Sequence, residues 1–241
     1  WDIYRMSDPG ILQAFVNADD MLRKLAAGDT TQLAVNDTAT VLDTIWKPVL
    51  DSLGNITGDS TMSVERVLTN PDTTNTGDVG PLLSVLNLNQ SNGQSILYPQ
   101  SVMGVANKNK IKSIDAMLAN PRLVSVFPQD VKFMWSKKPM TDAKGIETDQ
   151  YELYAIKMKR GSNEAPLEGD RIVTATSSPD PMTSEVVVTL RMDNTGAKIW
   201  SEMTTKAAQD NNREIAIALD NEVVSAPRVN EPITTGSSRI S

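Results

Sequence analysis

The spacing of apolar residues predicts an amphipathic helix over residues 7–26. Ser7 or Asp8 can cap its N-terminus. Apolar residues then recur at the three- and four-residue steps that place side chains on one helical face. Asp19 and Asp20 fall on the other face, where solvent is the expected environment. The apolar positions are Ile11, Phe15, Ala18, Leu22 and Leu25.

Further elements follow from the same patterns in the second half of the chain. Apolar and polar residues alternate at period two in several short runs, which is typical of half-buried strands. Two other runs have helical spacing, and Asp193 or Asn194 can cap the second of them. Its inward row is Ile199, Met203 and Ala207, with Trp200 beside it. The expected strands are residues 131–137, 151–159, 171–176 and 185–191, and the expected helices are residues 107–118 and 195–209.

Asp220 lies between two short apolar runs, "IAIAL" and "EVVSA". An Asp-Asn pair in that position suits a two-residue hairpin loop, because both residues tolerate positive φ. A catalytic acid would need a second titratable partner, and Glu222 points to the opposite side of the strand from Val223. We therefore interpret Asp220 as the corner of a hairpin.

The segment from residue 27 to residue 105 has a different composition. Thr, Asn, Asp, Ser and Gly dominate it, and residues 69–78 are its most loop-like part. Apolar patches at residues 41–53 and 62–68 could each form a short helix. An ordered elaboration and a mobile surface segment are both compatible with this composition.

Together these patterns predict an α+β fold. It has an antiparallel sheet with helices packed on one face, plus a Thr/Asn/Asp-rich, partly helical insertion. The expected divisions are an N-terminal strand end and helix (1–26), the insertion (27–105) and an α+β core (106–241).

Composition narrows the possible functions. The 241 residues include 39% hydrophobic residues, which is enough for a core, and carry a net charge of −7, which argues against a nucleic-acid surface. The absence of Cys and His excludes thiol nucleophiles, Ser-His-Asp triads and His-based zinc sites. No apolar run reaches the ~18–20 residues of a membrane span. Because the chain begins at Trp1, we interpret it as a piece of a longer protein.

Carboxylates are the remaining candidates for chemistry. Glu168 and Asp170 lie two residues apart near a strand start, where both could line one face, as in glycosidases. The sequence has no Gly-rich phosphate loop and no calcium loop. We assign no catalytic, cofactor or metal site, and a hydrolase that uses Glu168, Asp170 or Asp220 is the remote alternative.

Three stretches, residues 165–175, 186–204 and 216–241, resemble the first periplasmic (P1) loop of SecD and fused SecDF protein-export proteins, and specifically its head subdomain. "FPQDVKFMWSKKP" and "YELYAIK" resemble the fused Gram-negative variant, with part of the region that flanks the head. The matching positions are Leu167, Gly169, Ile172, Gly196, Ala197, Trp200, Thr204, Ala216, Ile217, Leu219, Asp220, Val223, Ser225, Pro227, Ile233, Gly236 and Ile240.

The resemblance implies a role without enzymatic activity or cofactors. Such a head binds or clamps the emerging unfolded preprotein on the periplasmic side of the bacterial inner membrane. It works with SecYEG and with SecF, or a fused SecF half, in proton-motive-force-driven export. The parent chain would be membrane-embedded, and no nucleic acid would be a partner. Residues that contact the preprotein are not assigned.

Two features bear on how such a head could bind. The eleven Met residues could form an adaptable apolar surface, although core filling is the more frequent use of Met. An open sheet edge could accept an added strand. A free-standing periplasmic or surface binding protein without membrane helices is the main alternative function.

Overall fold

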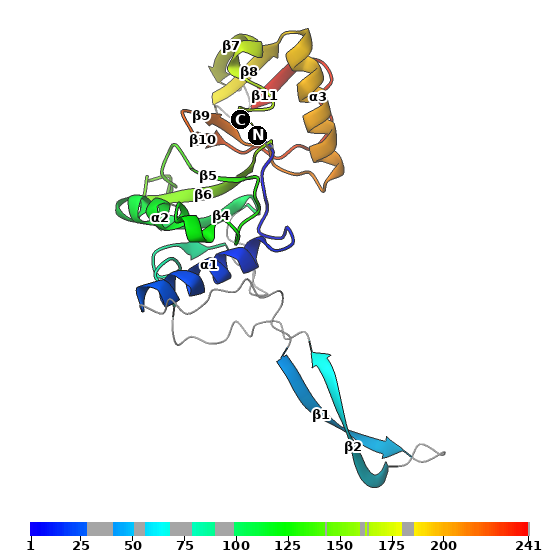
Figure 1. Ribbon diagram of the computed structural model, residues 1–241. Coiled ribbons are helices and arrows are strands. Elements are labelled where there is room, and N and C mark those ends of the chain that lie inside the picture. The colour runs from blue at the N-terminus through cyan, green and yellow to red at the C-terminus, as the bar shows by residue number, and fades with distance from the viewer. Residues whose placement is uncertain are drawn as a thin grey trace. The chain divides into compact units, whose positions relative to one another are not determined.

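The computed structural model divides the chain into two compact units. Residues 27–79 form one unit, and residues 1–26 together with residues 80–241 form the other. Strands β1 and β2 belong to the smaller unit, and the other labelled elements belong to the larger one (Figure 1). The structure describes residues 1–27, 41–50, 56–67, 79–89, 99–142, 144–159, 162, 164–179 and 186–240.

The smaller unit contains a two-stranded antiparallel hairpin. Thr, Ile and Val are frequent in both strands, and these β-branched residues suit a pleated strand better than a helix. The register places Trp46 opposite Met62. The strands are β1 (Val41–Leu50) and β2 (Ile56–Val67).

This hairpin corrects one expectation. The apolar patches at residues 41–53 and 62–68 are strands, not short helices, wherever the structure describes them. Pro48 disfavours a helix in the first patch because it has no N–H to donate. The second patch pairs across the hairpin, and local periodicity does not report such a partner. The loop-like stretch at residues 69–78 lies outside the described residues.

A four-stranded antiparallel sheet forms the centre of the first half of the larger unit. Its strands follow the order β3-β4-β6-β5. Helices α1 and α2 cover one face, where side chains from helices and sheet form a buried cluster (Figure 1). The elements are α1 (Ile11–Ala26), β3 (Asn87–Leu88), β4 (Val102–Asn107), α2 (Ile111–Leu118), β5 (Val131–Trp135) and β6 (Gln150–Lys157).

The three phenylalanines of the chain meet in this cluster. Phe15 lies 5.2 Å from Phe127 and 5.7 Å from Phe133, measured between ring centroids, and Phe127 lies 5.1 Å from Phe133. The rings are tilted or edge-on, the arrangement that their quadrupoles favour. All three phenylalanines of the chain thus pack together in one part of the core.

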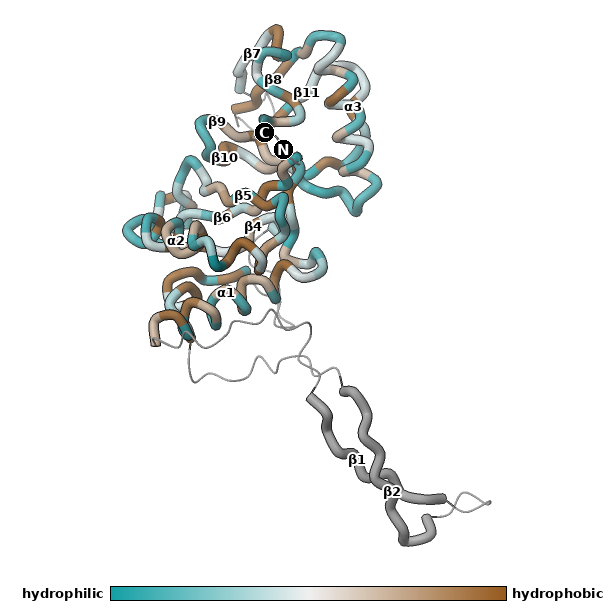
Figure 2. The backbone as a smooth tube through the Cα atoms, viewed as in Figure 1, coloured by the Kyte–Doolittle hydropathy of each residue, from teal (hydrophilic) through white to brown (hydrophobic). Residues whose placement is uncertain are grey.

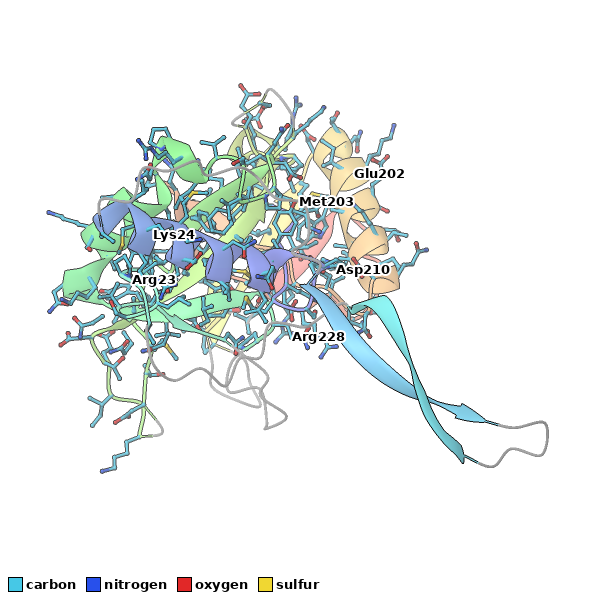
Figure 3. The ribbon with its side chains drawn as sticks, turned by 60° about the horizontal axis from the view of Figure 1, so that its bottom comes forward. Arg23, Lys24, Glu202, Met203, Asp210 and Arg228 are labelled. Carbon is cyan, nitrogen blue, oxygen red and sulfur yellow. The ribbon has the colours of Figure 1, made fainter. Side chains whose placement is uncertain are left out.

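Asp19 corrects the expectation that both aspartates of α1 are solvated. Its carboxylate is buried and accepts hydrogen bonds from the backbone N–H groups of Gly80, Leu82 and Leu83 at 2.8, 2.8 and 2.9 Å. Asp20 behaves as expected. It is partly exposed and forms ion pairs with Arg23 and Lys24, the two residues labelled on α1 in Figure 3.

Residues 80–89 and 99–105 pack in the larger unit. Leu82, Leu86 and Met103 are each at most 1% exposed and belong to the same buried cluster as α1. The division between the two compact units therefore falls between Val79 and Gly80, inside the range expected for the insertion, residues 27–105.

The opposite face of the four-stranded sheet packs on a second hairpin and on the N-terminal segment. Ile156 from the sheet, Val223 from the hairpin and Ile3 share one buried cluster. Asp220 and Asn221 form the turn with φ of 55° and 63°, left-handed values that Asp and Asn tolerate. Asp220 is therefore a corner, as its sequence context predicts. The strands are β9 (Ile217–Leu219) and β10 (Glu222–Ser225).

A separate three-stranded antiparallel sheet in the order β11-β8-β7 lies beside helix α3 (Figure 1). The Asp193 carboxylate accepts a hydrogen bond from the Gly196 N–H at 2.7 Å and caps α3, as predicted. Met203 is buried, whereas its neighbour Glu202 points to solvent (Figure 3). The elements are β7 (Ile172–Pro179), β8 (Val186–Met192), α3 (Asn194–Gln209) and β11 (Ser237–Ile240), with short 3₁₀ helices at Lys108–Lys110, Pro121–Leu123 and Gly169–Arg171.

The α+β class with antiparallel pairing is confirmed. The strands expected in one sheet are distributed over separate sheets, because β8 pairs with β7 and β11 and not with the strands of the first half. Hydrophobic and hydrophilic residues alternate along these elements (Figure 2).

Candidate binding groove

The larger unit contains a mainly apolar groove of about 720 Å³. Its wall is formed by residues of the three-stranded sheet, of α3 and of the β9–β10 hairpin. Apolar side chains dominate the lining, including those of Ile172, Leu190, Met192, Trp200, Met203 and Leu219.

Simple periodicity places these side chains. Val188, Leu190 and Met192 are separated by two residues along β8, so they share one face of the sheet. Trp200 and Met203 are three residues apart on α3 and share one face of the helix. The groove therefore lies between an apolar face of the sheet and an apolar face of the helix, which do not pack fully against each other.

Trp200 has an unusual position in this lining. Its side chain is 7% exposed, and its indole Nε1 is buried without a hydrogen-bond partner among the described residues. A buried N–H without an acceptor reduces the stability of the folded state. Burial of the apolar part of the indole, and not a hydrogen bond from its N–H, therefore stabilises Trp200 in this position.

A second group of residues holds α3 in place. The Thr204 hydroxyl donates to the carbonyl oxygen of Trp200 at 2.8 Å and accepts from the N–H of Ile233 at 2.9 Å. Gly236 has φ of 68°, and a Cβ on it would lie 2.8 Å from the Cβ of Ala197. A glycine is needed there, because any side chain would be strained and would collide with α3.

The residues of the family motif therefore separate into three places. Those that line the groove are Leu167, Gly169, Ile172, Trp200, Ala216, Ile217, Leu219, Ser225 and Ile240. Those around α3 are Gly196, Ala197, Thr204, Ile233 and Gly236. Those of the β9–β10 hairpin and its exit are Asp220 in the turn, Val223 in the second cluster and Pro227, whose carbonyl oxygen accepts from the N–H of Ile215.

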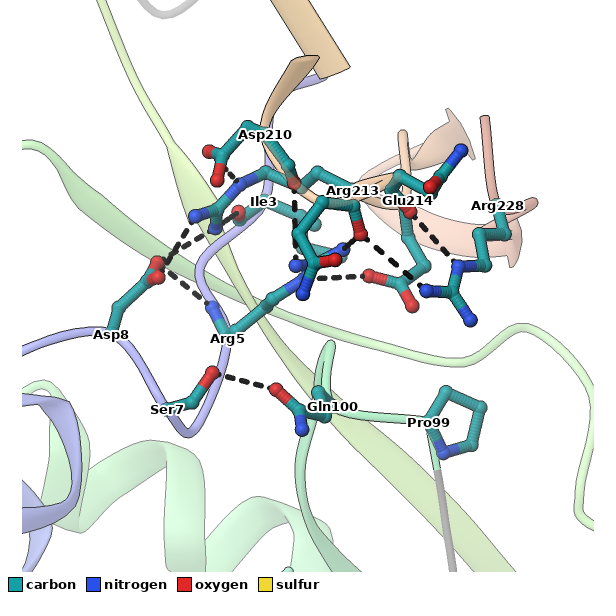
Figure 4. A network of polar contacts seen from close by, with 12 residues as sticks. Ile3, Arg5, Ser7, Asp8, Pro99, Gln100, Asp210, Arg213, Glu214 and Arg228 are labelled. Carbon is teal, nitrogen blue, oxygen red and sulfur yellow. Dashed lines mark hydrogen bonds and ion pairs between the residues drawn. The ribbon is translucent and has the colours of Figure 1, made fainter. Parts of the chain in front are cut away.

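A buried polar network joins the N-terminal segment to the segment after α3 (Figure 4). Arg213 donates to both carboxylate oxygens of Asp8, at 2.7 and 2.9 Å, and to Asp210 at 2.6 Å. Arg5 donates to Glu214 at 3.1 Å, and both side chains of this pair are about nine-tenths buried. Sequence reasoning misses this network, because the two pairs that join the segments, Arg213–Asp8 and Arg5–Glu214, are 205 and 209 residues apart.

The network shifts the pKa of Asp8. Burial alone would raise that pKa, but the hydrogen bonds from Arg213 and from the backbone N–H of Arg5, together with the nearby positive charges, hold it below its usual value. Asp8 is therefore ionised in the folded protein at neutral pH, and its charge stabilises this junction.

The three carboxylates that could support hydrolysis do not form one site. Glu168 lines the groove and is exposed, Asp170 is exposed and pairs with Arg171, and Asp220 is an exposed turn residue near Lys137. Within the part of the chain that the structure describes, no three acidic side chains gather as a metal site would require. Among the same residues, no helix is long and apolar enough to cross a membrane.

The antiparallel sheets and the helices beside them define an α+β domain, and its apolar groove is the candidate binding site. Residues 147–241, which include most of the groove lining, match the family model described as SecDF, P1 head subdomain.

Curated relatives extend this match along the chain. The protein translocase subunit SecD of Rhodothermus marinus is 29% identical over 236 residues, which are 98% of this chain and 32% of that protein. The protein of the same name from Treponema pallidum is 44% identical over 78 residues, which are 32% of this chain and 13% of that protein. The chain thus spans a third or less of the length of these relatives.

A solved structure of SecDF, described as a membrane component that enhances protein export, is also similar. It is 16% identical with a TM-score of 0.30, over 100% of this chain and 83% of that one. Residues 147–241 are therefore similar to the P1 head subdomain of SecDF, and the chain as a whole is similar in sequence to part of SecD. The resemblance noted in the sequence is confirmed.

Proposed function

We propose that this chain is the periplasmic head portion of a SecD/SecDF-type translocation accessory protein. It binds or clamps the emerging unfolded preprotein and so assists proton-motive-force-driven export through SecYEG. The observation that carries the proposal is the apolar groove of about 720 Å³, lined mostly by residues of the segment 147–241 that matches the P1 head subdomain model. The relatives that match this chain in sequence are named protein translocase subunit SecD.

The chemistry of the groove suits an unfolded polypeptide. Such a chain exposes apolar side chains of many shapes, and a surface that binds it must adapt to each of them. Met134, Met192 and Met203 line the groove, and the flexible thioether side chain of Met repacks around different ligands. The remaining lining is mostly aliphatic, so binding would depend on apolar area and not on one sequence.

The proposal assigns the chain no catalytic role and no cofactor. The parent protein would sit in the bacterial inner membrane, with SecYEG and SecF, or a fused SecF half, as its partners. Proton transfer would take place in the membrane helices of that parent protein. The head would contribute binding and motion.

Photocrosslinking in the parent protein tests this proposal. A photoreactive amino acid replaces Val188 or Val224, both of which line the groove, or Val124, which is 69% exposed and does not line it. With a preprotein arrested during export, we expect crosslinks from the two groove positions and none from the control. Equal crosslinking from all three positions, or none from the groove, would contradict the proposal.

The groove would equally suit a free-standing periplasmic binding protein, since a groove needs no membrane helices. Sequencing the reading frame of the parent distinguishes the two functions. Flanking apolar spans of about 20 residues support the export protein. A parent that has a signal peptide and no spans supports the free-standing protein.

A further inference from the structure

Strand β7 is the open edge of the three-stranded sheet. In the order β11-β8-β7 it pairs with β8 on one side, and no strand among the described residues pairs with its other side. From Val173 onward every residue of β7 is exposed. Alternate residues of an edge strand direct their backbone N–H and C=O groups away from the sheet, so along its length β7 presents hydrogen-bonding groups that pair with no strand of the described part of the chain.

This edge lacks the usual protection against pairing. Folded proteins guard exposed edges with charged side chains, with proline or by keeping the strand short. Between Thr174 and Ser178, β7 carries only Thr, Ala and Ser, and its single proline is Pro179 at its end. The opposite edge strand, β11, has only four residues and carries Arg239. The two edges of one sheet therefore differ in how open they are to another strand.

The open edge also borders the apolar groove. Ala175 lies opposite Leu190 in the register, and both line the groove. Thr176 lies opposite Thr189, on the other face of the sheet. A strand added beside β7 would continue this pleat, so every second side chain of it would face the groove.

We propose that the open edge of β7 binds an extended segment of the unfolded polypeptide as an added β-strand. The inference rests on the proposed function and specifies its mode. Main-chain hydrogen bonds to β7 would provide binding that does not depend on sequence, and the groove would select segments with apolar residues at alternate positions. The partner is therefore an extended, alternately apolar polypeptide.

Methylated peptides test this mode on the 241-residue chain. The probe is a fluorescein-labelled nonapeptide of alternating Val and Thr. Two further versions carry N-methyl groups either on all Val residues or on all Thr residues. In an added strand only one of these series points its N–H groups at β7. We expect that series to lose affinity by on the order of 100-fold, since several hydrogen bonds are lost, while the other retains it.

A pair of protein variants provides the matched test. Residues 175 and 176 are neighbours, so only one of their N–H groups faces the open edge. The two variants are Ala175→Pro and Thr176→Pro, and one of them removes the N–H group that faces the open edge. That variant should unfold at the temperature of the wild type but should bind the unmethylated peptide at least about tenfold more weakly. The other variant should lose stability, because it breaks a hydrogen bond to β8.

The outcomes separate the two proposals. Equal binding of both methylated series overturns strand addition but leaves the binding of unfolded chains intact. Strand addition also fails if the peptide does not bind while a reduced, unfolded protein does. If neither binds, the proposed function fails with it. A dimer of this chain that the open-edge proline variant dissociates would show that β7 pairs with a second copy instead.

Discussion

The two halves of the larger unit use their apolar residues in different ways. The sheet covered by α1 and α2 encloses its apolar side chains, and both Phe15 and Leu153 are 0% exposed. In the three-stranded sheet, Val188, Leu190 and Met192 are only half-buried and border the groove. The same alternation of apolar residues thus produces a closed core in one half and an open surface in the other.

The difference follows from what covers each sheet. Two helices and a cluster of three phenylalanines fill the space over the first sheet. A single helix and a short hairpin border the second, and they leave about 720 Å³ unfilled. We infer that the first half provides stability and that the second uses part of its potential packing for binding. Substitutions in the two halves should therefore differ in their effects.

Phe15 should give the largest effect. Phe15→Ala removes a ring that touches two other rings and leaves a cavity, so we expect the free energy of unfolding to fall by about 3–5 kcal/mol. Leu190→Ala in the groove should cost only about 1 kcal/mol, because less buried area is lost. Urea denaturation of both variants measures the difference. Equal losses would show that the two halves are equally packed.

Asp19 should give the next largest effect. Asp19→Ala leaves the N–H groups of Gly80, Leu82 and Leu83 without an acceptor, and we expect a loss of about 2–4 kcal/mol in the free energy of unfolding. The adjacent Asp20→Ala is the control and should cost less than about 1 kcal/mol, since its ion pairs are half-exposed. Urea denaturation measures both variants. If they lose the same free energy of unfolding, the role assigned to Asp19 is wrong.

Asp8 makes the junction between the halves sensitive to acid. Its pKa is lower in the folded state than the unfolded value of about 3.9, so its contribution is present above about pH 4 and is lost as the pH falls through the folded pKa. We expect the stability of Asp8→Asn to decline less than that of the wild type between about pH 5 and pH 2. The thermal unfolding temperature of both proteins is measured over this pH range. If it declines equally in the variant and the wild type, Asp8 does not contribute to the acid sensitivity.

Trp200→Phe should give the smallest effect. Trp200→Phe keeps an aromatic ring in the groove wall and removes the buried N–H that has no acceptor among the described residues. We expect the free energy of unfolding to change by less than about 1 kcal/mol, or to rise, because an unsatisfied donor is lost. A large loss in urea denaturation would show that the indole N–H has a partner in solution. Trp200→Ala is the comparison and should cost about 3–5 kcal/mol.

Local signals in the sequence predict much of this fold. The Asp220-Asn221 turn, the Asp193 cap of α3 and the strands β5 to β8 depend on neighbouring residues, and patterns of two to four residues reveal them. The same signals indicate an α+β class. The motif residues Gly236 and Thr204 emerge through the family resemblance, and the structure supplies their physical reasons.

Features that depend on distant residues escape such signals. Helical periodicity predicts that Asp19 is exposed to solvent. The prediction fails because the backbone N–H groups that bind its carboxylate lie 61 to 64 residues away. The Arg213–Asp8 pair spans 205 residues. The groove depends on how the three-stranded sheet, α3 and the β9–β10 hairpin pack together. The alternation of residues along β8 does not show whether its apolar face is fully covered or partly exposed.

Hydrogen exchange on the whole chain tests the central claim most directly. Amide exchange is measured with and without a reduced, permanently unfolded protein. The account predicts added protection in β7, β8, α3 and the β9–β10 hairpin, and none in α1, α2 or the four-stranded sheet. Protection that is absent, or that falls on the four-stranded sheet instead, would contradict the division into a closed core and a binding head.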